Sequence, residues 1–421
     1  MTAARVALAA ALAAAALAAP GCVARRAGRP APLGEMPLVR VGIVVDRPSG
    51  SFGAAGQFRV LNAGGDIIAI VDAGVTWRVE PAEGGRVRLI RPDREDAVVA
   101  AGPVAVVPER ATDLVVIEGR RYRGDALVQR GSAGVTIVNR VPLEWYLRSV
   151  TALELGFRAP GDRQAVLAQA VAARTYAVRY RGRREALGFD LFPTEADQVY
   201  SGVEAEKPEV DEAVRLTAGQ ILTWRGEPIE ALFHSACGHS TEAAAEVFRN
   251  GPGAPYLRAV SDRSGRGRDD YYCRISPRYR WREEWDGAAL NAVLARTLPA
   301  VAGAEAANLG RVRAVRVSAT TPTGRVRELV VETASGTFTV PGWRVRDVLR
   351  PAPDRQLWSS QFQLHEERRG EDLVRLVAAG AGAGHGVGMC QWGAVGRSRA
   401  GQRYDRILAA YYPGTLLRRV Y

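Results

Sequence analysis

The sequence predicts an α+β protein in which a β-rich N-terminal region, residues 39–124, precedes a mixed α/β domain, residues 125–421. From residue 39 to about residue 130, short runs rich in valine and isoleucine alternate with turn residues and show no helical period. Further along, alanine-rich stretches with helical spacing alternate with short apolar runs. With 421 residues and 47% hydrophobic composition, the chain can bury a large core and form more than one domain.

The first 22 residues have the pattern of an export signal. Arg5 precedes an apolar run over residues 6–19 that is too short to span a bilayer comfortably, and small residues lead to Cys22. We therefore expect an exported protein of the cell envelope. Cys22 is a candidate for lipidation, which would anchor the N-terminus to a membrane, and ordinary cleavage and an uncleaved anchor are the alternatives. Residues 23–38, rich in Ala, Arg, Pro and Gly, predict a linker.

Strands dominate the expected N-terminal region. Turn residues separate five β-branched runs, at residues 39–45, 66–71, 86–90, 98–107 and 114–117.

The region after residue 125 predicts helices and strands in alternation. A strand over 134–141 leads into a helix that begins near Pro142, because proline suits a first helical turn. A long helix is expected over 162–185, with Gly182 weakening its last turns, and its alanines favour close packing. The further expected elements are a helix at 209–217, a strand pair of 220–224 with 229–233, a flexible loop at 261–270, strands at 312–318 and 327–331, and a segment at 343–350.

The net charge of +12 raises the question of a nucleic-acid partner. Lys207 is the only lysine, and the arginines are scattered over the whole chain without a basic helix interleaved with aromatic residues. This distribution indicates a solvated basic surface and argues against nucleic-acid binding.

Several motifs follow one another in the second region. Residues 142–156 read Pro-Leu-Glu-Trp-Tyr-Leu-Arg-Ser-Val-Thr-Ala-Leu-Glu-Leu-Gly, and 165–176 read Ala-Val-Leu-Ala-Gln-Ala-Val-Ala-Ala-Arg-Thr-Tyr. Residues 197–203 read Asp-Gln-Val-Tyr-Ser-Gly-Val, and 232–239 read Leu-Phe-His-Ser-Ala-Cys-Gly-His. Residues 384–394 read Gly-His-Gly-Val-Gly-Met-Cys-Gln-Trp-Gly-Ala, and 411–415 read Tyr-Tyr-Pro-Gly-Thr. In this order the motifs resemble the SpoIID/LytB family of bacterial cell-wall proteins over residues 125–421.

The resemblance implies activity on the glycan strands of peptidoglycan. Members studied as enzymes are lytic transglycosylases, which cleave beside N-acetylmuramic acid and leave a 1,6-anhydro end. Other members are non-catalytic wall-binding proteins that enhance or localise an amidase, so a cell-wall amidase is the expected alternative partner. A zinc hydrolase is a third alternative.

Glu154 is the candidate general acid and base. It lies between Leu153 and Leu155, and burial with both leucines would raise the pKa of its carboxyl group toward neutrality. A lytic transglycosylase can work with one carboxyl group, because the substrate's own C6 hydroxyl attacks and no water is activated. A surface carboxylate that caps a loop or helix is the structural alternative.

Nine further residues are candidates for glycan binding. For Gln169 and Arg174, a buried polar network is an equal alternative, and aromatic residues such as Tyr176 and Tyr200 are more often part of a core. The candidates are Gln169, Arg174, Tyr176, Gln198, Tyr200, His234, Ser235, His385 and Gln391.

The cysteines of an exported protein predict a disulfide, and we expect it between Cys237 and Cys273, which leaves Cys390 unpaired. Some family members bind zinc through Cys and His residues just before the Gln-Val-Tyr motif, but residues 189–197 contain neither residue type. A substitute site from His234, Cys237 and His239 stays open as the less favoured alternative. We therefore expect no metal and no cofactor.

Overall fold

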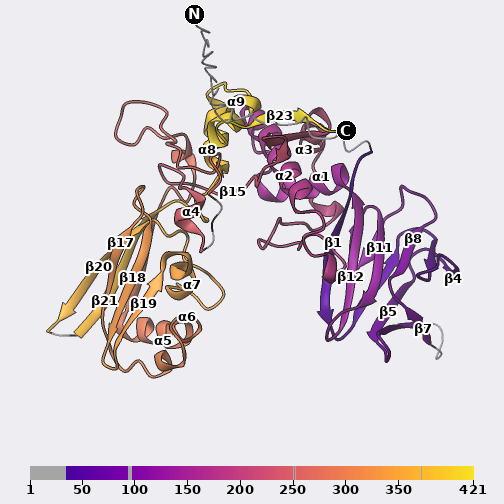
Figure 1. Ribbon diagram of the computed structural model, residues 1–421, viewed down its shortest axis with the longest axis horizontal. Helices are drawn as coiled ribbons and strands as arrows, with labels where there is room; N and C mark the ends of the chain where they lie inside the picture. Colours follow the sequence, from indigo (N-terminus) through magenta and orange to yellow (C-terminus); the bar gives the residue numbers. More distant parts are fainter. Residues whose placement is uncertain (1–34, 93–96, 250, 252, 371) are drawn as a thin grey trace, which may run out of the picture.

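The computed structural model of the chain describes residues 35–421, apart from 93–96, 250, 252 and 371 (Figure 1). The predicted signal at 1–22, the lipidation candidate Cys22 and most of the linker lie outside the described residues. Among the described residues, every regular element from Leu38 to Pro142 is a strand, and helices and strands alternate after that point. The α+β prediction is therefore confirmed.

The N-terminal region forms two six-stranded sheets, with strand orders β1-β12-β11-β8-β3-β4 and β10-β9-β2-β5-β6-β7. Buried and exposed positions alternate along strands such as β5 and β6, because successive side chains point to opposite faces of a strand. The strands are β1 (Leu38–Arg47), β2 (Gly50–Ala54), β3 (Phe58–Leu61), β4 (Ile67–Val71), β5 (Thr76–Pro81), β6 (Arg86–Ile90), β7 (Ala97–Ala101), β8 (Val104–Pro108), β9 (Val115–Ile117), β10 (Arg120–Tyr122), β11 (Asp125–Arg130) and β12 (Val135–Pro142). Because β1 pairs with β12, one sheet is continuous across residues 124 and 125, and the domain boundary expected there stays a prediction.

A helical layer follows β12. Helix α1 (Leu143–Glu154) begins directly after Pro142, and α2 (Arg163–Tyr180) crosses the centre of the layer. The alanines of α2 are fully buried, which allows α1, α3 (Pro208–Leu216), α8 (Gln391–Arg399) and α9 (Tyr404–Tyr411) to pack closely around it. Helix α2 ends before the predicted residue 185, because Gly182 adopts φ 75° and turns the chain.

Strand pairing near the site differs from the expectation. Strand β13 (Gln220–Trp224) pairs with β14 (Glu227–Pro228) and β23 (Leu416–Arg419). The predicted pairing of 220–224 with 229–233 therefore begins earlier, at Glu227, and within the predicted partner segment the N–H of Ile229 donates to the carbonyl of Leu222. Strand β15 (Phe233–His234) instead pairs in parallel with β22 (Met389–Cys390), which brings His234 opposite Cys390. The pairing unites two motifs that lie far apart in the sequence.

A second lobe, residues 280–381, has a hydrophobic core of its own, built around residues such as Trp285, Leu329 and Leu376. Two three-stranded sheets, β16-β21-β20 and β17-β18-β19, form its framework. Its elements are β16 (Arg280–Asp286), α5 (Gly287–Thr297), α6 (Pro299–Ala302), β17 (Val312–Thr320), β18 (Val326–Thr333), β19 (Thr337–Pro341), α7 (Val345–Val348), β20 (Phe362–Arg369) and β21 (Asp372–Ala381).

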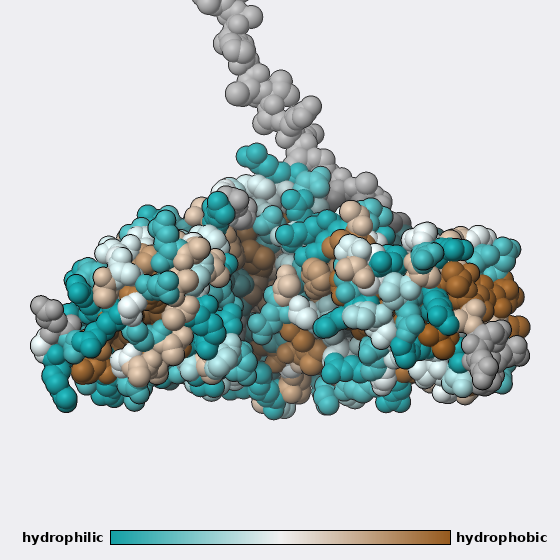
Figure 2. Space-filling model, turned by 90° about the horizontal axis from the view of Figure 1, so that it is seen from below, coloured by the Kyte–Doolittle hydropathy of each residue, from teal (hydrophilic) through white to brown (hydrophobic). Residues whose placement is uncertain are grey.

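The N-terminal sheets and the second lobe lie on opposite sides of the helical layer (Figure 1). Seen from below, they border a hollow with apolar residues in its depth (Figure 2). None of the helices within the described part of the chain combines the length and the hydropathy needed to cross a membrane.

Candidate functional site

Glu154 is the last residue of α1. Its Oε1 accepts a hydrogen bond from the backbone N–H of Val199 at 2.9 Å, and its Oε2 accepts one from Nε2 of Gln391 at 3.4 Å. A carboxylate at the C-terminal end of a helix faces the negative end of the helix dipole, so helix stability does not favour this placement. The three residues come from separate segments, and the fold brings Glu154 and Gln391 together as candidate site residues.

Burial raises the pKa of Glu154, and the negative charge of Glu195 raises it further, whereas the hydrogen bonds from Val199 and Gln391 act in the opposite direction. Only one of the two flanking leucines is buried with Glu154. Leu155 is 4% exposed, whereas Leu153 is 41% exposed. The expected burial between two leucines is thus half correct. The side chain remains partly accessible, as a group that must meet a substrate requires.

Two histidines lie at the pairing of β15 and β22: His234 in β15, and His385 in the loop before β22. Nε2 of His385 donates to the carbonyl of Phe233 at 2.8 Å, and its Nδ1 accepts from the N–H of Val387 at 3.1 Å. Burial, together with the neighbouring His234, lowers the pKa of His385 to about 3. Nδ1 of His234 lies 3.1 Å from the carbonyl oxygen of Val387, which can only accept, so Nδ1 is the donor. These imidazoles serve as fixed hydrogen-bonding groups.

Ser235 connects β15 to α8, because its carbonyl accepts the backbone N–H of Trp392 at 3.0 Å. The guanidinium of Arg158 lies 4.8 Å from the centre of the Trp392 ring. Sequence analysis missed this pair, although Trp392 stands directly beside Gln391 in the 384–394 motif.

Arg174 and Gln169 lie in the interior, where neither is exposed. The guanidinium of Arg174 forms an ion pair with Glu144 at 2.7 Å and also donates to Thr217 and to backbone carbonyls. This is the buried network that was weighed against glycan binding. Both polar atoms of the Gln169 amide are buried without a hydrogen-bond partner among the described residues.

Tyr176, Gln198 and Tyr200 support the loop that carries Val199. The hydroxyl of Tyr176 donates to Asp197 at 2.9 Å. The hydroxyl of Tyr200 donates to Asn139 at 2.8 Å, and Gln198 accepts from the hydroxyl of Tyr146 at 3.2 Å. All three side chains are buried in this structure, and their role as glycan contacts stays a prediction.

The second lobe reaches the same region through Arg346 of α7. Burial lowers the pKa of Arg346, and the charge of Glu195 acts against that shift. Glu195 therefore lies within electrostatic range of both Glu154 and Arg346. No sequence signal marked either residue, because their proximity arises from the packing of distant segments.

Cys237 and Cys273 lie together, but their sulfur atoms are 3.5 Å apart, beyond the length of about 2 Å of a disulfide bond. The structure thus has free thiols at this position, and the disulfide stays a prediction. Cys390, expected to be unpaired, joins them, since its Sγ accepts the N–H of Cys237 at 3.2 Å. His239, from the alternative zinc site, instead contacts the amide of Gln361.

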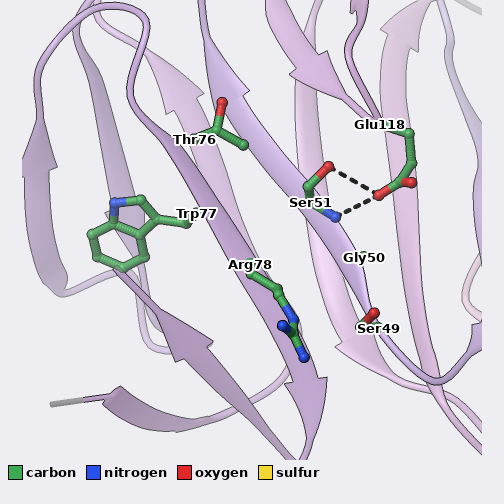
Figure 3. A pocket seen from close by; sticks show the side chains of 7 residues that line it. All are labelled: Ser49, Gly50, Ser51, Thr76, Trp77, Arg78 and Glu118. Carbon is green, nitrogen blue, oxygen red and sulfur yellow. Dashed lines mark hydrogen bonds between the residues drawn. The ribbon is translucent and has the colours of Figure 1, made fainter. Parts of the chain in front are cut away.

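A separate depression of about 280 Å³ lies on the N-terminal sheet that contains β2 and β5 (Figure 3). The backbone N–H and the hydroxyl of Ser51 both donate to the carboxylate of Glu118, at 2.5 and 3.0 Å. Strand backbone and short polar groups line most of this depression, and it contains none of the predicted site residues.

The sequence pattern of the family described as Stage II sporulation protein (SpoIID) matches residues 131–224, which include Glu154 and Val199. A second family, a domain of unknown function (DUF8618), matches residues 266–388, which contain the second lobe.

Three relatives extend the similarity over most of the chain. An uncharacterized protein of Brachyspira hyodysenteriae is 30% identical over 304 residues, covering 72% of this chain and 73% of that protein. Stage II sporulation protein D of Bacillus subtilis is 29% identical, covering 66% of this chain and 75% of that protein. The amidase enhancer of Bacillus subtilis is 28% identical, and the match covers 67% of this chain but only 39% of that protein. The chain belongs to the SpoIID family.

Proposed function

We propose that the protein is an exported, peptidoglycan-processing lytic transglycosylase in which Glu154 is the general acid and base. It would cleave glycan strands beside N-acetylmuramic acid and form 1,6-anhydro ends. The observation that carries the proposal is the Glu154 carboxyl group itself. Its pKa is raised by burial, yet it remains partly accessible and is oriented by Val199 and Gln391.

The reaction balances with one carboxyl group. Protonated Glu154 gives its proton to the glycosidic oxygen, and the bond from that oxygen to C1 of N-acetylmuramic acid breaks. The C6 hydroxyl of the same sugar then forms the new bond to C1 and returns its proton to Glu154. Because the pKa of Glu154 is raised, a larger fraction of the enzyme holds this proton near neutral pH.

The glycan would bind across the partly accessible Glu154 carboxyl group. Gln391 contacts the acid directly. His234 lies in β15, Ser235 follows it, and His385 hydrogen-bonds to the carbonyl of Phe233 in the same strand. Trp392, with Arg158 against its ring, offers a face for a sugar. Arg346 of the second lobe would supply a positive charge for the lactyl or peptide carboxylates of the strand.

The relatives support a role at the cell wall, since two of them are named Stage II sporulation protein D and amidase enhancer. The second name is the reason to keep one alternative, a non-catalytic wall-binding protein that enhances or localises an amidase. Under either function the protein would act in the cell envelope, where lipidation of Cys22 would anchor it to a membrane.

Mass spectrometry of glycan products tests the proposal. Denuded glycan strands and intact sacculi are incubated with the wild-type protein and with Glu154→Gln, and binding to the same substrates is measured in parallel. Anhydro-muramyl products from the wild type alone would support the transglycosylase. Intact glycan binding without products from either protein would support the amidase enhancer.

A further inference from the structure

A buried cluster of metal-ligating groups includes Cys390, which directly precedes the Gln391 that contacts Glu154. The Sγ atoms of Cys237, Cys273 and Cys390 and a carboxylate oxygen of Asp262 all lie within 4.8 Å of one another. The four residues come from four segments: the turn after β15, a loop, the short 3₁₀ helix Tyr272–Ile275 and the N-terminus of α8. None of the three thiols is exposed, and neither is Asp262. We propose that these four groups bind one zinc ion.

The separations suit a tetrahedral ion. Zinc bound to thiolates at about 2.3 Å separates two sulfur atoms by about 3.8 Å at tetrahedral angles. Cys237 and Cys273 lie 3.5 Å apart, close to that separation and far from that of a covalent pair. Three thiolates and a carboxylate form a closed four-ligand set without a position for water, as in structural zinc sites.

The surroundings of the cluster orient its ligands. Sγ of Cys390 accepts N–H groups from Cys237 and Gly393, both at 3.2 Å. Asp262 accepts the N–H of Cys273 at 2.9 Å and the hydroxyl of Tyr411 at 2.6 Å. Such outer hydrogen bonds fix ligand geometry around metals, and N–H donors favour a thiolate over a thiol.

A disulfide between Cys237 and Cys273 explains these contacts less well. It would leave Cys390 outside the covalent pair, as a buried sulfur with two N–H donors directed at it. A zinc ion unites all three sulfur atoms in one site.

The charges near the cluster are compatible with this set. Zinc with three thiolates and one carboxylate carries a net charge of −2. Arg397 lies 3.5 Å from Asp262, and the buried Arg325 interacts electrostatically with Cys237 and Cys390. Arg325 also interacts with Glu242, so the two arginines offset the negative charge in part.

His234 is the competing fourth ligand. It lies opposite Cys390 in the paired strands, and its buried Nε2 has no hydrogen-bond partner among the described residues. Asp262 is favoured because its carboxylate lies within the 4.8 Å cluster. Variants at the two positions therefore separate the alternatives.

The first experiment measures the zinc content of the full chain purified without chelators, by elemental analysis and native mass spectrometry. We expect about one zinc per chain, and we expect Cys390→Ser to bind zinc at least tenfold more weakly. Cys22→Ser, at a cysteine outside the described residues, is the matched control and should retain the metal. A metal-free wild type with Cys237 and Cys273 joined in one disulfide-linked peptide would overturn the proposal.

Two further measurements do not depend on the folding of a cysteine variant. Chelation of the wild type followed by cobalt(II) addition should produce the charge-transfer absorption of thiolate-bound cobalt, and its absence would overturn the site. Asp262→Asn should weaken zinc binding while His234→Gln retains it, and the opposite pattern would overturn Asp262 as fourth ligand. Since no glycan is present in these assays, they can fail or succeed independently of the proposed catalytic function.

Discussion

Glu154→Gln should abolish cleavage while leaving fold and glycan binding intact. The variant removes the proton that the reaction needs but keeps the size of the side chain. The carbonyl of the new amide can still accept the N–H of Val199, which lies 2.9 Å from the present carboxylate. The contact with Gln391 at 3.4 Å is long, and a flip of the Gln391 amide restores it. The structural cost should therefore stay near that of one neutral hydrogen bond, about 1 kcal/mol.

The loss of the general acid determines how far the rate of cleavage falls. Positioned acid or base groups contribute about 10²- to 10⁴-fold in rate, which corresponds to about 3 to 5 kcal/mol of activation free energy. The rate of anhydro-product formation by the variant should fall by this factor, while its affinity for denuded glycan stays unchanged. Product analysis by mass spectrometry and a sedimentation assay of glycan binding measure the two quantities separately.

The stability of the same variant provides an independent check of the raised pKa. At acid pH, Glu154 is protonated in both the folded and the unfolded chain, so wild type and variant should differ little. As the pH rises from the ordinary pKa of a glutamate toward the raised one, the unfolded wild type releases its proton first, and the folded wild type loses stability. The variant should therefore gain stability relative to the wild type over that interval. Wild-type rates of product formation by Glu154→Gln would refute the reasoning.

Three further predictions follow from the described contacts. Glu195→Gln should keep cleavage but move the basic limb of the pH profile of kcat/KM to lower pH, because this change removes a charge that raises the pKa of Glu154. An unmoved limb would contradict this. Arg174→Met should lower the free energy of unfolding by about 3 to 5 kcal/mol in urea titrations, because Glu144 is left buried without its ion-pair partner. A loss of glycan binding at unchanged stability would instead indicate that Arg174 contacts the substrate. Leu329→Ala should destabilise the second lobe by about 2 to 5 kcal/mol and shift one of two calorimetric transitions, whereas a common shift of both would argue for a single folding unit.

The sequence predicts strands well where β-branched residues alternate with turns, but it conceals strands built from small residues. Strand β2 (Gly50–Ala54) is an example, because Gly50 and Gly53 stand where a Cβ atom would meet Ile137 and the carbonyl of Val75. Gly50 thus allows close packing against the other sheet and Gly53 close approach of the neighbouring chain segment in its own sheet, which the local sequence does not reveal.

The sequence indicates which side chains are candidates for the site, but it does not indicate which residues contact one another there. Glu154 and Gln391 stand in separate motifs, and the structure brings them together. The N–H of Val199 could not be found from side-chain chemistry, because every residue except proline offers a backbone donor. Arg174 was predicted to touch either glycan or a buried network, and only tertiary packing distinguishes these alternatives.

The chain enters and leaves the second lobe at neighbouring positions. Arg280 and Ala381 are paired partners in neighbouring strands, and the N–H of Gly382 donates to the carbonyl of Tyr279 at 3.3 Å. A segment whose two ends meet and which has its own core can be inserted or removed as a unit. A short glycine linker between residues 279 and 382 could take its place, and relatives could exchange such segments during evolution while the helical layer and Glu154 remain the same.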